Sequence, residues 1–299
     1  MHCSNSLRKV MEEDYFRLSV TIRSPKTRLQ YGLAMNEFAA VLGREPVIGD
    51  LTDDNIAALM HEMIDRGLAP KTVNERRGRI HSLWTWLVRR GVVHHLPTTP
   101  RVDEPVRIPM AWTRHELNRL YASCAAQSGT IAGIPAGQWW MSLHLVCWDT
   151  GERIGALWQL TWDCVDLIDR WVKIPAELRK AKHADMTYRI SREAVKLLRS
   201  IRTPDRRLIW PWPYSRAYIW TRYAKILKQA GLPTDRRSKF HRMRRSVASH
   251  YEAAGGNATA LLGHTSRRVT ESYLDPRIVK TTQPCDVLFR LSEPSEDDK

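Results

Sequence analysis

The sequence predicts a mainly α-helical protein with one small β-sheet, divided into a helical N-terminal domain and a mixed α/β C-terminal domain. Three observations support this fold class. The first hundred residues carry apolar side chains at helical spacing. Residues 96–112 hold four prolines and no helical period, which is typical of a linker between domains. Strand-like segments occur only after that linker, so we expect domains over residues 1–107, which include most of the linker, and 108–299.

The N-terminal domain is expected to contain three helices, each of which ends at a glycine. The first spans residues 24–43 and opens with Ser-Pro, because proline fits the first helical turn. The second spans residues 52–67 and opens with Thr and two aspartates, which suit the positive end of the helix dipole. The third and longest spans residues 70–91 and carries an apolar stripe. The three apolar faces predict a shared helical core.

The C-terminal domain is expected to contain both helices and strands. Thr113 and Glu116 form a capping-box pattern, which predicts that a helix begins there. The apolar run at 143–148 is helical in pattern, stops at Gly151, and is followed by a second helix. The segments "RWVKIP" and "MTYRI" indicate two short strands joined by a basic hairpin. Further helices are expected over residues 215–229 and 242–254 and on either side of Gly263.

The charge of the chain points to a polyanionic partner. The 299 residues carry a formal net charge of +15, and the sequence pI is near 9.9. Lysines and arginines are spread through the chain, and each phosphate they neutralise releases condensed counterions. Anionic membranes and RNA would also attract such a protein, but we expect nucleic acid as the partner.

Other classes of protein are disfavoured by the composition. No apolar run approaches the ~20 residues that span a bilayer, and the N-terminus has no apolar signal region. The five cysteines are scattered without a CxxC pair, which argues against a disulfide framework and a structural zinc site. We therefore expect a cytoplasmic, nucleoid-associated protein with no membrane partner and no metal or other cofactor.

The third predicted helix carries a polar and mostly basic cluster off its apolar stripe. This cluster is either a solvated helix face or a surface that follows DNA phosphates, and the excess positive charge elsewhere favours the second interpretation. The candidate DNA-binding residues are Lys71, Asn74, Arg76, Arg77 and Arg79.

Three motifs in the C-terminal domain gather residues suited to phosphate chemistry. "TGERIGAL" presents Arg153 just after a glycine turn. "FHRMRRS" places His241 and Arg244 three residues apart, so both share one helix face. "LLGHTSRRVTESYLDP" contains His264 and, nine residues later, Tyr273. Taken singly, each residue also fits a packing, capping or surface role.

In this order the motifs, together with a lysine on the basic hairpin, resemble the tyrosine recombinase, or phage integrase, family. The resemblance covers roughly residues 12–290. It implies a helical core-binding domain with a SAM-like fold, followed by a mixed α/β tyrosine-recombinase catalytic domain. It also implies that DNA strands are cut and rejoined without metal or ATP, through a 3′-phosphotyrosine intermediate.

The resemblance assigns a role to each motif residue. Tyr273 would be the nucleophile, while Arg153 and Arg244 would stabilise the charge that gathers on the phosphate oxygens. Such planar guanidiniums offer paired donors and stay charged at any working pH. His241 would take part in proton transfer, and His264 would donate a hydrogen bond to a phosphate oxygen.

Two departures from the family pattern stand out. The family usually has an acidic residue three positions after the first arginine, where this chain has Ala156. Glu152 is adjacent to Arg153 but is expected to point elsewhere, so the residue that holds Arg153 is unidentified. The hairpin offers both Lys180 and Lys182 as the general acid, and spacing before the second strand favours Lys182.

We therefore expect a site-specific recombinase or integrase of a phage or another mobile element, acting on double-stranded DNA sites as a homotetramer. The apolar segment at 286–291 could dock on a neighbouring copy or on its own domain, and both options stay open. The alternatives are a type IB topoisomerase, which relaxes DNA as a monomer, and a catalytically inactive DNA-binding regulator.

Overall fold

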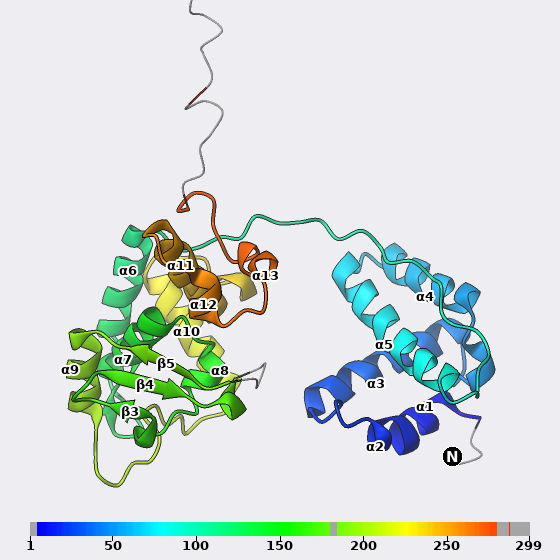
Figure 1. The fold of residues 1–299 in the computed structure, drawn as a ribbon, viewed down its shortest axis with the longest axis horizontal. Helices are drawn as coiled ribbons and strands as arrows, with labels where there is room; N and C mark the ends of the chain where they lie inside the picture. Colours follow the sequence, from blue (N-terminus) through cyan, green and yellow to red (C-terminus); the bar gives the residue numbers. More distant parts are fainter. Residues whose placement is uncertain (1–4, 180–183, 280–286, 288–299) are drawn as a thin grey trace, which may run out of the picture. The chain divides into compact units, whose positions relative to one another are not determined.

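The computed structural model describes residues 5–179, 184–279 and 287 (Figure 1). The chain divides into two compact units, Met1–Val106 and Arg107–Lys299, and the predicted division lay between residues 107 and 108. Both units are mostly helical, and the strands lie in the second unit, which confirms the predicted fold class. No helix in the described part of the chain has the length and apolar character needed to cross a membrane.

The first unit is built on the three predicted helices. Their N-terminal signals fall where expected, and Gly43 ends the first of them with a positive φ of 67°. The structure adds an N-terminal helical stretch that the sequence reasoning missed, in which Leu7 and Met11 are buried in the unit's core. The helices of this unit are α1 (Leu7–Lys9), η1 (Val10–Tyr15), α2 (Phe16–Leu18), α3 (Pro25–Leu42), η2 (Ile48–Asp50), α4 (Asp53–Asp65) and α5 (Pro70–Val88).

A strap formed by residues 98–102 is tied to the helices of the first unit. The Asp53 carboxylate accepts hydrogen bonds from the backbone N–H groups of Thr98 and Thr99, at 2.9 and 2.8 Å. The Asn74 side chain bonds both the N–H and the C=O of Val102, and Arg77 donates to the Thr99 carbonyl. The first part of the predicted linker is therefore extended but is bound to its own unit.

The second unit combines eight α-helices within its described residues with two small antiparallel sheets. One sheet has three strands in the order β3–β4–β5, with Trp171 opposite Arg189, and the other is a hairpin of β1 and β2. The helices are α6 (Arg114–Ala125), α7 (Ala136–Thr150), α8 (Ile154–Leu157), α9 (Arg192–Ile201), α10 (Tyr218–Gln229), α11 (Phe240–Ala253), α12 (Ala258–Leu262) and α13 (Arg267–Glu271). The strands are β1 (Thr130–Ile131), β2 (Ile134–Pro135), β3 (Val165–Asp166), β4 (Trp171–Ile174) and β5 (Met186–Arg189), and short 3₁₀ turns are η3 (Trp162–Cys164), η4 (Ala176–Leu178) and η5 (Arg236–Ser238).

Several of these elements follow from local signals, and others do not. The capping box that begins α6 is present, since Thr113 N–H donates to the Glu116 carboxylate at 2.7 Å and Thr113 Oγ1 accepts from Glu116 N–H at 3.3 Å. Strands β4 and β5 were predicted. Strands β1, β2 and β3 have only two residues each, which is too short for a visible alternation. Helix α9 was also missed.

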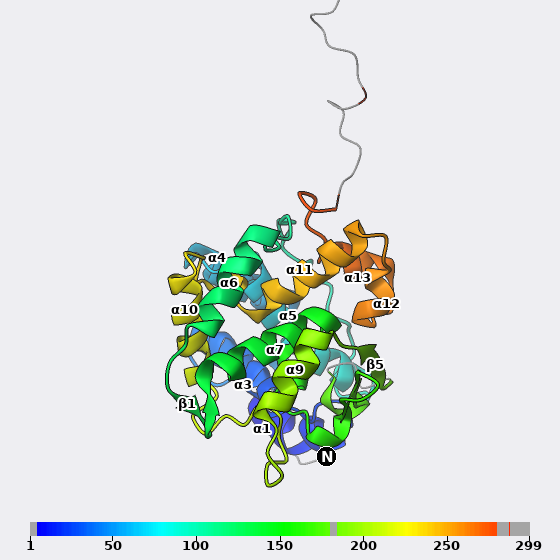
Figure 2. The same ribbon diagram turned by 90° about the vertical axis from the view of Figure 1, so that its left-hand side faces the viewer.

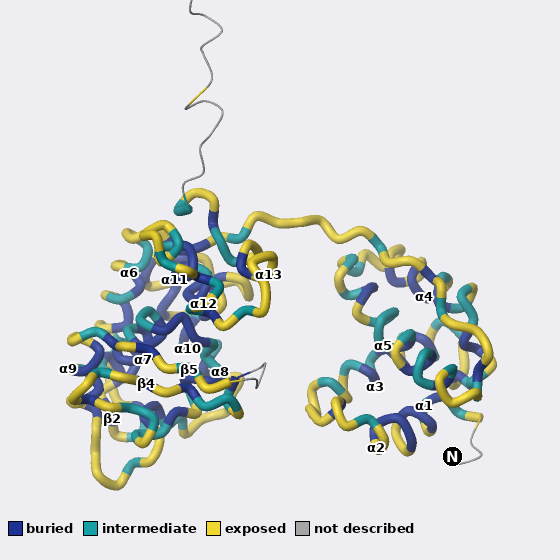
Figure 3. The backbone as a smooth tube through the Cα atoms, viewed as in Figure 1, coloured by how far each residue is buried: buried dark blue, intermediate teal, exposed yellow. Residues whose placement is uncertain are grey.

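Helix α7 runs through the core of the second unit and packs against α6, α9, α11 and β5 (Figures 2 and 3). Its side chains are buried along most of its length, including Trp139 and Trp140. Trp140 stacks on Phe240, the first residue of α11, and Phe240 stacks on Tyr223 of α10 with ring centroids 4.2 Å apart. This aromatic stack fixes the start of α11, the helix that carries His241 and Arg244.

Candidate active site

Arg153 is placed by the turn that ends α7. Gly151 has a φ of 63°, and a Cβ there would lie 3.1 Å from Leu262 and 3.2 Å from Val247. Both the backbone angle and the close approach therefore require glycine. Arg153 follows as the N-cap residue of α8, in an extended conformation, as its motif predicts.

Arg244 lies at the centre of the site and is almost completely buried, with 1% of its side chain exposed. Its Nη1 donates to the Gly151 carbonyl at 2.6 Å, and its Nη2 donates to the Leu262 carbonyl at 3.0 Å. This one guanidinium thus joins the end of α7 to the end of α12. Within the described residues its buried Nε has no hydrogen-bond partner.

Tyr273 lies just after α13 and its backbone is held by α11. Ser249 Oγ donates to the Tyr273 carbonyl at 3.3 Å and accepts from the Asp275 N–H at 2.9 Å. The Tyr273 ring packs near two imidazoles, with its centroid 5.2 Å from that of His241 and 4.9 Å from that of His264. Arg244 Cζ is 5.8 Å from the same ring.

Both histidines are held in the neutral form at pH 7. Partial loss of hydration, together with the positive charges of Arg244 and Arg153, lowers the pKa of His241 and of His264 to about 4 in each case. For His241 the nearby Arg245 adds to the effect. His264 Nε2 is 3.4 Å from Arg244 Nη2, so it accepts, and Nδ1 donates to Thr270 Oγ1 at 3.0 Å. A neutral His241 can accept a proton from a neighbouring hydroxyl.

Glu152 points into the site toward Arg244, and it does not bind the side chain of Arg153. Its carboxylate is 3.6 Å from Arg244 Nη1 and accepts from the Arg153 backbone N–H at 3.0 Å. Arg179 Nε donates to it at 2.7 Å and the Tyr188 hydroxyl at 3.1 Å. The sequence reasoning missed Arg179 and Tyr188 and gave Glu152 no role. The available signal was an acidic residue next to Arg153 in a chain that lacks one at position 156.

Of the other predicted residues, two lie outside the described part of the chain and five belong to the first unit. Lys180 and Lys182 fall outside the described residues, in the connection between η4 and β5. On α5, Lys71 is exposed, whereas Arg76 donates to the Gln30 side chain at 2.9 Å and Arg79 lies over the Tyr31 ring. Asn74 and Arg77 hold the strap.

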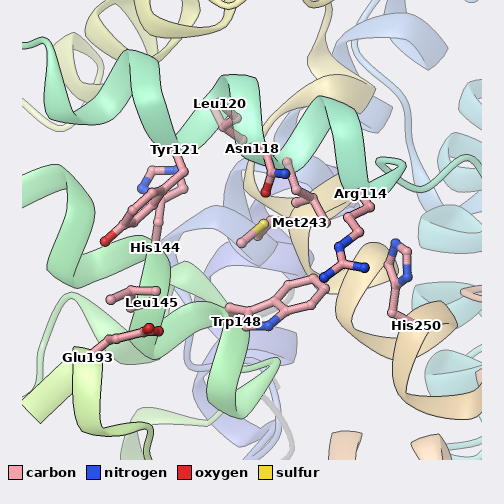
Figure 4. A pocket seen from close by; sticks show the side chains of 11 residues that line it. Arg114, Asn118, Leu120, Tyr121, His144, Leu145, Trp148, Glu193, Met243 and His250 are labelled. Atoms are coloured by element: carbon pink, nitrogen blue, oxygen red, sulfur yellow. The ribbon is translucent and has the colours of Figure 1, made fainter. Parts of the chain in front are cut away.

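A separate pocket of about 710 Å³ lies among α6, α7 and α11 (Figure 4). Arg114, Tyr121, Trp148 and His250 are among the residues that line it, and none of the predicted catalytic residues does. Elsewhere in the described ranges, no three His, Cys, Asp or Glu side chains are grouped so as to hold a metal ion. The candidate site is built from guanidinium, imidazole and phenol groups, with the Glu152 carboxylate beside Arg244.

Known proteins resemble this chain in sequence. Residues 112–278 match the model of the phage integrase family. Tyrosine recombinase XerC of Neisseria meningitidis serogroup C is 27% identical over 268 residues, which cover 84% of this chain and 85% of that protein. XerC of serogroup B is 26% identical over 264 residues with the same coverage.

Solved structures show the same fold at lower sequence identity. A lambda integrase dimer bound to a COC′ core site has a TM-score of 0.70 at 18% identity, covering 93% of this chain and 98% of that one. The Tn1549 transposon integrase in complex with transposon right end DNA has a TM-score of 0.72 at 13% identity, covering 90% of this chain and 94% of that one. The family match includes all five candidate residues described above. The chain belongs to the phage integrase family of tyrosine recombinases, enzymes that break and rejoin DNA strands.

Proposed function

We propose that this protein is a site-specific recombinase that inserts or excises a mobile element, such as a phage, by way of a 3′-phosphotyrosine at Tyr273. The observation that carries the proposal is the proximity of the Tyr273 ring to His241, His264 and the buried Arg244. These residues come from α11, the turn after α12 and the segment after α13, so the fold has gathered groups that lie apart in sequence.

In the proposed reaction, the Tyr273 oxygen attacks the scissile phosphorus in line with the departing 5′ oxygen. His241 accepts the phenolic proton, which its neutral state permits. Arg153 and Arg244 stabilise the charge on the non-bridging oxygens. The bond from phosphorus to the 5′ oxygen breaks, and Lys182, or alternatively Lys180, protonates that oxygen. Attack by the 5′ hydroxyl of another strand reverses these steps and rejoins the DNA.

His264 requires a change of partner to act as proposed. A neutral imidazole that accepts from Arg244 at Nε2 carries its proton on Nδ1, facing Thr270. A phosphate oxygen that takes the Arg244 donor would leave Nε2 free to gain a proton and donate to the same phosphate. The negative charge of the phosphate would favour that protonated form.

We infer that four copies assemble on two DNA duplexes. We also infer that the protein is cytoplasmic and associated with the nucleoid. A lambda integrase tetramer bound to a Holliday junction has a TM-score of 0.69 with this chain, which supports a shared fold. Of the predicted docking segment at 286–291, the structure describes only residue 287. Docking on a neighbouring copy and docking on its own unit both remain alternatives.

A second candidate is recombination between two copies of a site on the host chromosome. The curated relatives favour this alternative, because XerC is 27% identical over 85% of its own length, whereas the transposon integrase is 13% identical. The DNA that flanks the gene distinguishes the two, since a mobile element ends in attachment sites next to its integrase gene.

Incubation with supercoiled plasmid is the experiment that tests the proposed function. A plasmid that carries two cognate sites is expected to yield recombined circles, and a plasmid without sites is expected to remain unchanged. Relaxation of both plasmids without recombination would support a type IB topoisomerase. Binding without any strand cleavage would support an inactive regulator.

The basic cluster on α5 gives a separate prediction about DNA affinity. Lys71 is exposed, so Lys71→Gln should remove one phosphate contact and flatten the slope of log affinity against log salt by roughly one unit. Arg77→Gln is the matched variant, because Arg77 binds the Thr99 carbonyl. It should make the strap easier to cleave by protease at residues 98–102. An unchanged salt slope for Lys71→Gln would identify Lys71 as a solvated surface residue with no phosphate contact.

A further inference from the structure

We propose that Glu152 is a positioning residue for Arg244, and that it acts as the shared counter-charge of Arg244 and Arg179. The inference rests on the proposed function, in which Arg244 stabilises the phosphate. The chain would thus place one residue before Arg153 the acidic group that relatives usually have three residues after it. Arg179 would support the site through its ion pair with Glu152.

The four hydrogen-bonding and ionic contacts of Glu152 leave its carboxylate fully engaged. One oxygen accepts from Arg179 Nε at 2.7 Å and from the Tyr188 hydroxyl at 3.1 Å. The other accepts from the Arg153 N–H at 3.0 Å and lies 3.6 Å from Arg244 Nη1. The side chain of Glu152 is 1% exposed, and its negative charge would repel a DNA phosphate. It therefore acts through its neighbours.

Arg179 and Arg244 converge on one backbone carbonyl. Arg179 Nη2 is 3.3 Å from the Leu262 oxygen, and Arg244 Nη2 is 3.0 Å from the same oxygen. Their side chains are 6% and 1% exposed, so water screens the repulsion between the two guanidiniums poorly. Without a carboxylate between them, the two buried cations would move apart. Glu152 allows both to remain on the Leu262 carbonyl.

The contact with Gly263 restricts the direction in which Arg179 can move. A Cβ at Gly263 would lie 2.5 Å from Arg179 Nη2, so this guanidinium already packs closely on the turn that leads to His264. Arg244, in contrast, faces the Tyr273 ring, and displacement would shift it relative to the phosphate. The loss of the Glu152 charge should therefore displace mainly the Arg244 guanidinium.

Position 156 cannot supply the missing charge. Ala156 is 2% exposed and belongs to the apolar core of the second unit. Two guanidiniums and one carboxylate in the Glu152 cluster leave a single positive charge to interact with the phosphate.

The test compares covalent adduct formation on two DNA substrates. Glu152→Gln keeps the shape of the side chain and removes its charge. On an ordinary phosphodiester we expect roughly a hundredfold slower adduct formation than in the unmodified protein, because a misplacement of about 1 Å has effects of this size. With a methylphosphonate at the cleavage position, the substrate is neutral and depends less on Arg244. The deficit of the variant relative to the unmodified protein should then shrink to a few-fold.

A second variant separates charge balance from simple loss of structure. Glu152→Gln combined with Arg179→Met removes both members of the ion pair, so that Arg244 no longer faces a second unpaired cation. We expect this double variant to recover most of the adduct formation on the phosphodiester. Asp50→Asn is the matched control, because Asp50 is a buried carboxylate bonded to Arg44 in the first unit. It should change thermal stability without a difference between the two substrates.

The outcomes distinguish this inference from the proposed function. Equal deficits on both substrates, with no recovery in the double variant, would overturn the positioning role and leave a structural one. Normal activity of Glu152→Gln, with Arg244→Ala inactive, would overturn it also. If Glu152→Gln does not fold, the double variant decides by the same two-substrate comparison. Undiminished adduct formation in Arg244→Ala would instead contradict the proposed function itself.

Discussion

Tyr273→Phe is expected to abolish the covalent protein–DNA adduct while leaving the fold and the DNA affinity intact. The change removes one hydroxyl, which has no hydrogen-bond partner among the described residues. The ring itself packs against the small cluster of Ala248, Ala258 and Leu262, and phenylalanine keeps that packing. The measurement is incubation with cognate DNA, denaturation, and separation of adduct from free protein on a gel.

Tyr251→Phe is the matched control for this prediction. Tyr251 lies on α11, is 45% exposed and is not among the candidate catalytic residues, so its variant should form adduct at the normal yield. Adduct at normal yield in the Tyr273 variant would mean that another residue is the nucleophile. Loss of DNA binding in that variant would show that the hydroxyl has a role in affinity.

The second large effect concerns the leaving group. Lys182→Ala should cleave ordinary DNA at least about a hundredfold more slowly, because an alkoxide leaves poorly without a proton and general acid catalysis has effects of this order. Replacing the bridging 5′ oxygen with sulfur gives a thiolate whose conjugate acid has a pKa of ~8.5, so no proton donor is needed. The variant should then recover most of its cleavage rate.

Arg244→Ala provides the contrast for the sulfur substrate. Its proposed task is charge stabilisation at phosphorus, so the sulfur leaving group should not restore its activity. Rescue of Lys180→Ala in place of Lys182→Ala would assign the proton donor two residues upstream. Failure of sulfur to rescue either lysine variant would contradict a hairpin lysine as the general acid.

Local signals in the sequence predicted most of the long helices. Caps and glycines marked the ends of α3, α4 and α5 to within three residues, because these signals act through the backbone of neighbouring residues. The helical stretch at residues 7–18 was missed, since its stability comes from burial of Leu7 and Met11 against the other helices. Two-residue strands such as β3 form only because a neighbouring strand pairs with them.

The sequence did not predict the intramolecular contacts of the basic residues on α5. Lysine and arginine on one helix face predict a phosphate-binding surface, but the sequence does not show what lies over that face. In the structure the strap lies there, and Asn74 and Arg77 hydrogen-bond to its backbone. Lys71 stays exposed. Which of these residues contacts DNA remains a prediction that the salt-slope experiment addresses.

By itself the sequence determined the helical character of the protein, its positive charge, and the identity and order of Arg153, His241, Arg244, His264 and Tyr273, because motifs and composition are local properties of the chain. Only the tertiary structure decided which groups surround Arg244. Glu152 and Arg179 form an ion pair although 27 residues separate them along the chain. Glu152 lies 3.6 Å from Arg244, and Arg179 donates to the same Leu262 carbonyl as Arg244. This arrangement depends on burial and on the Leu262 carbonyl that the two arginines share, and neither is encoded in the spacing of the residues.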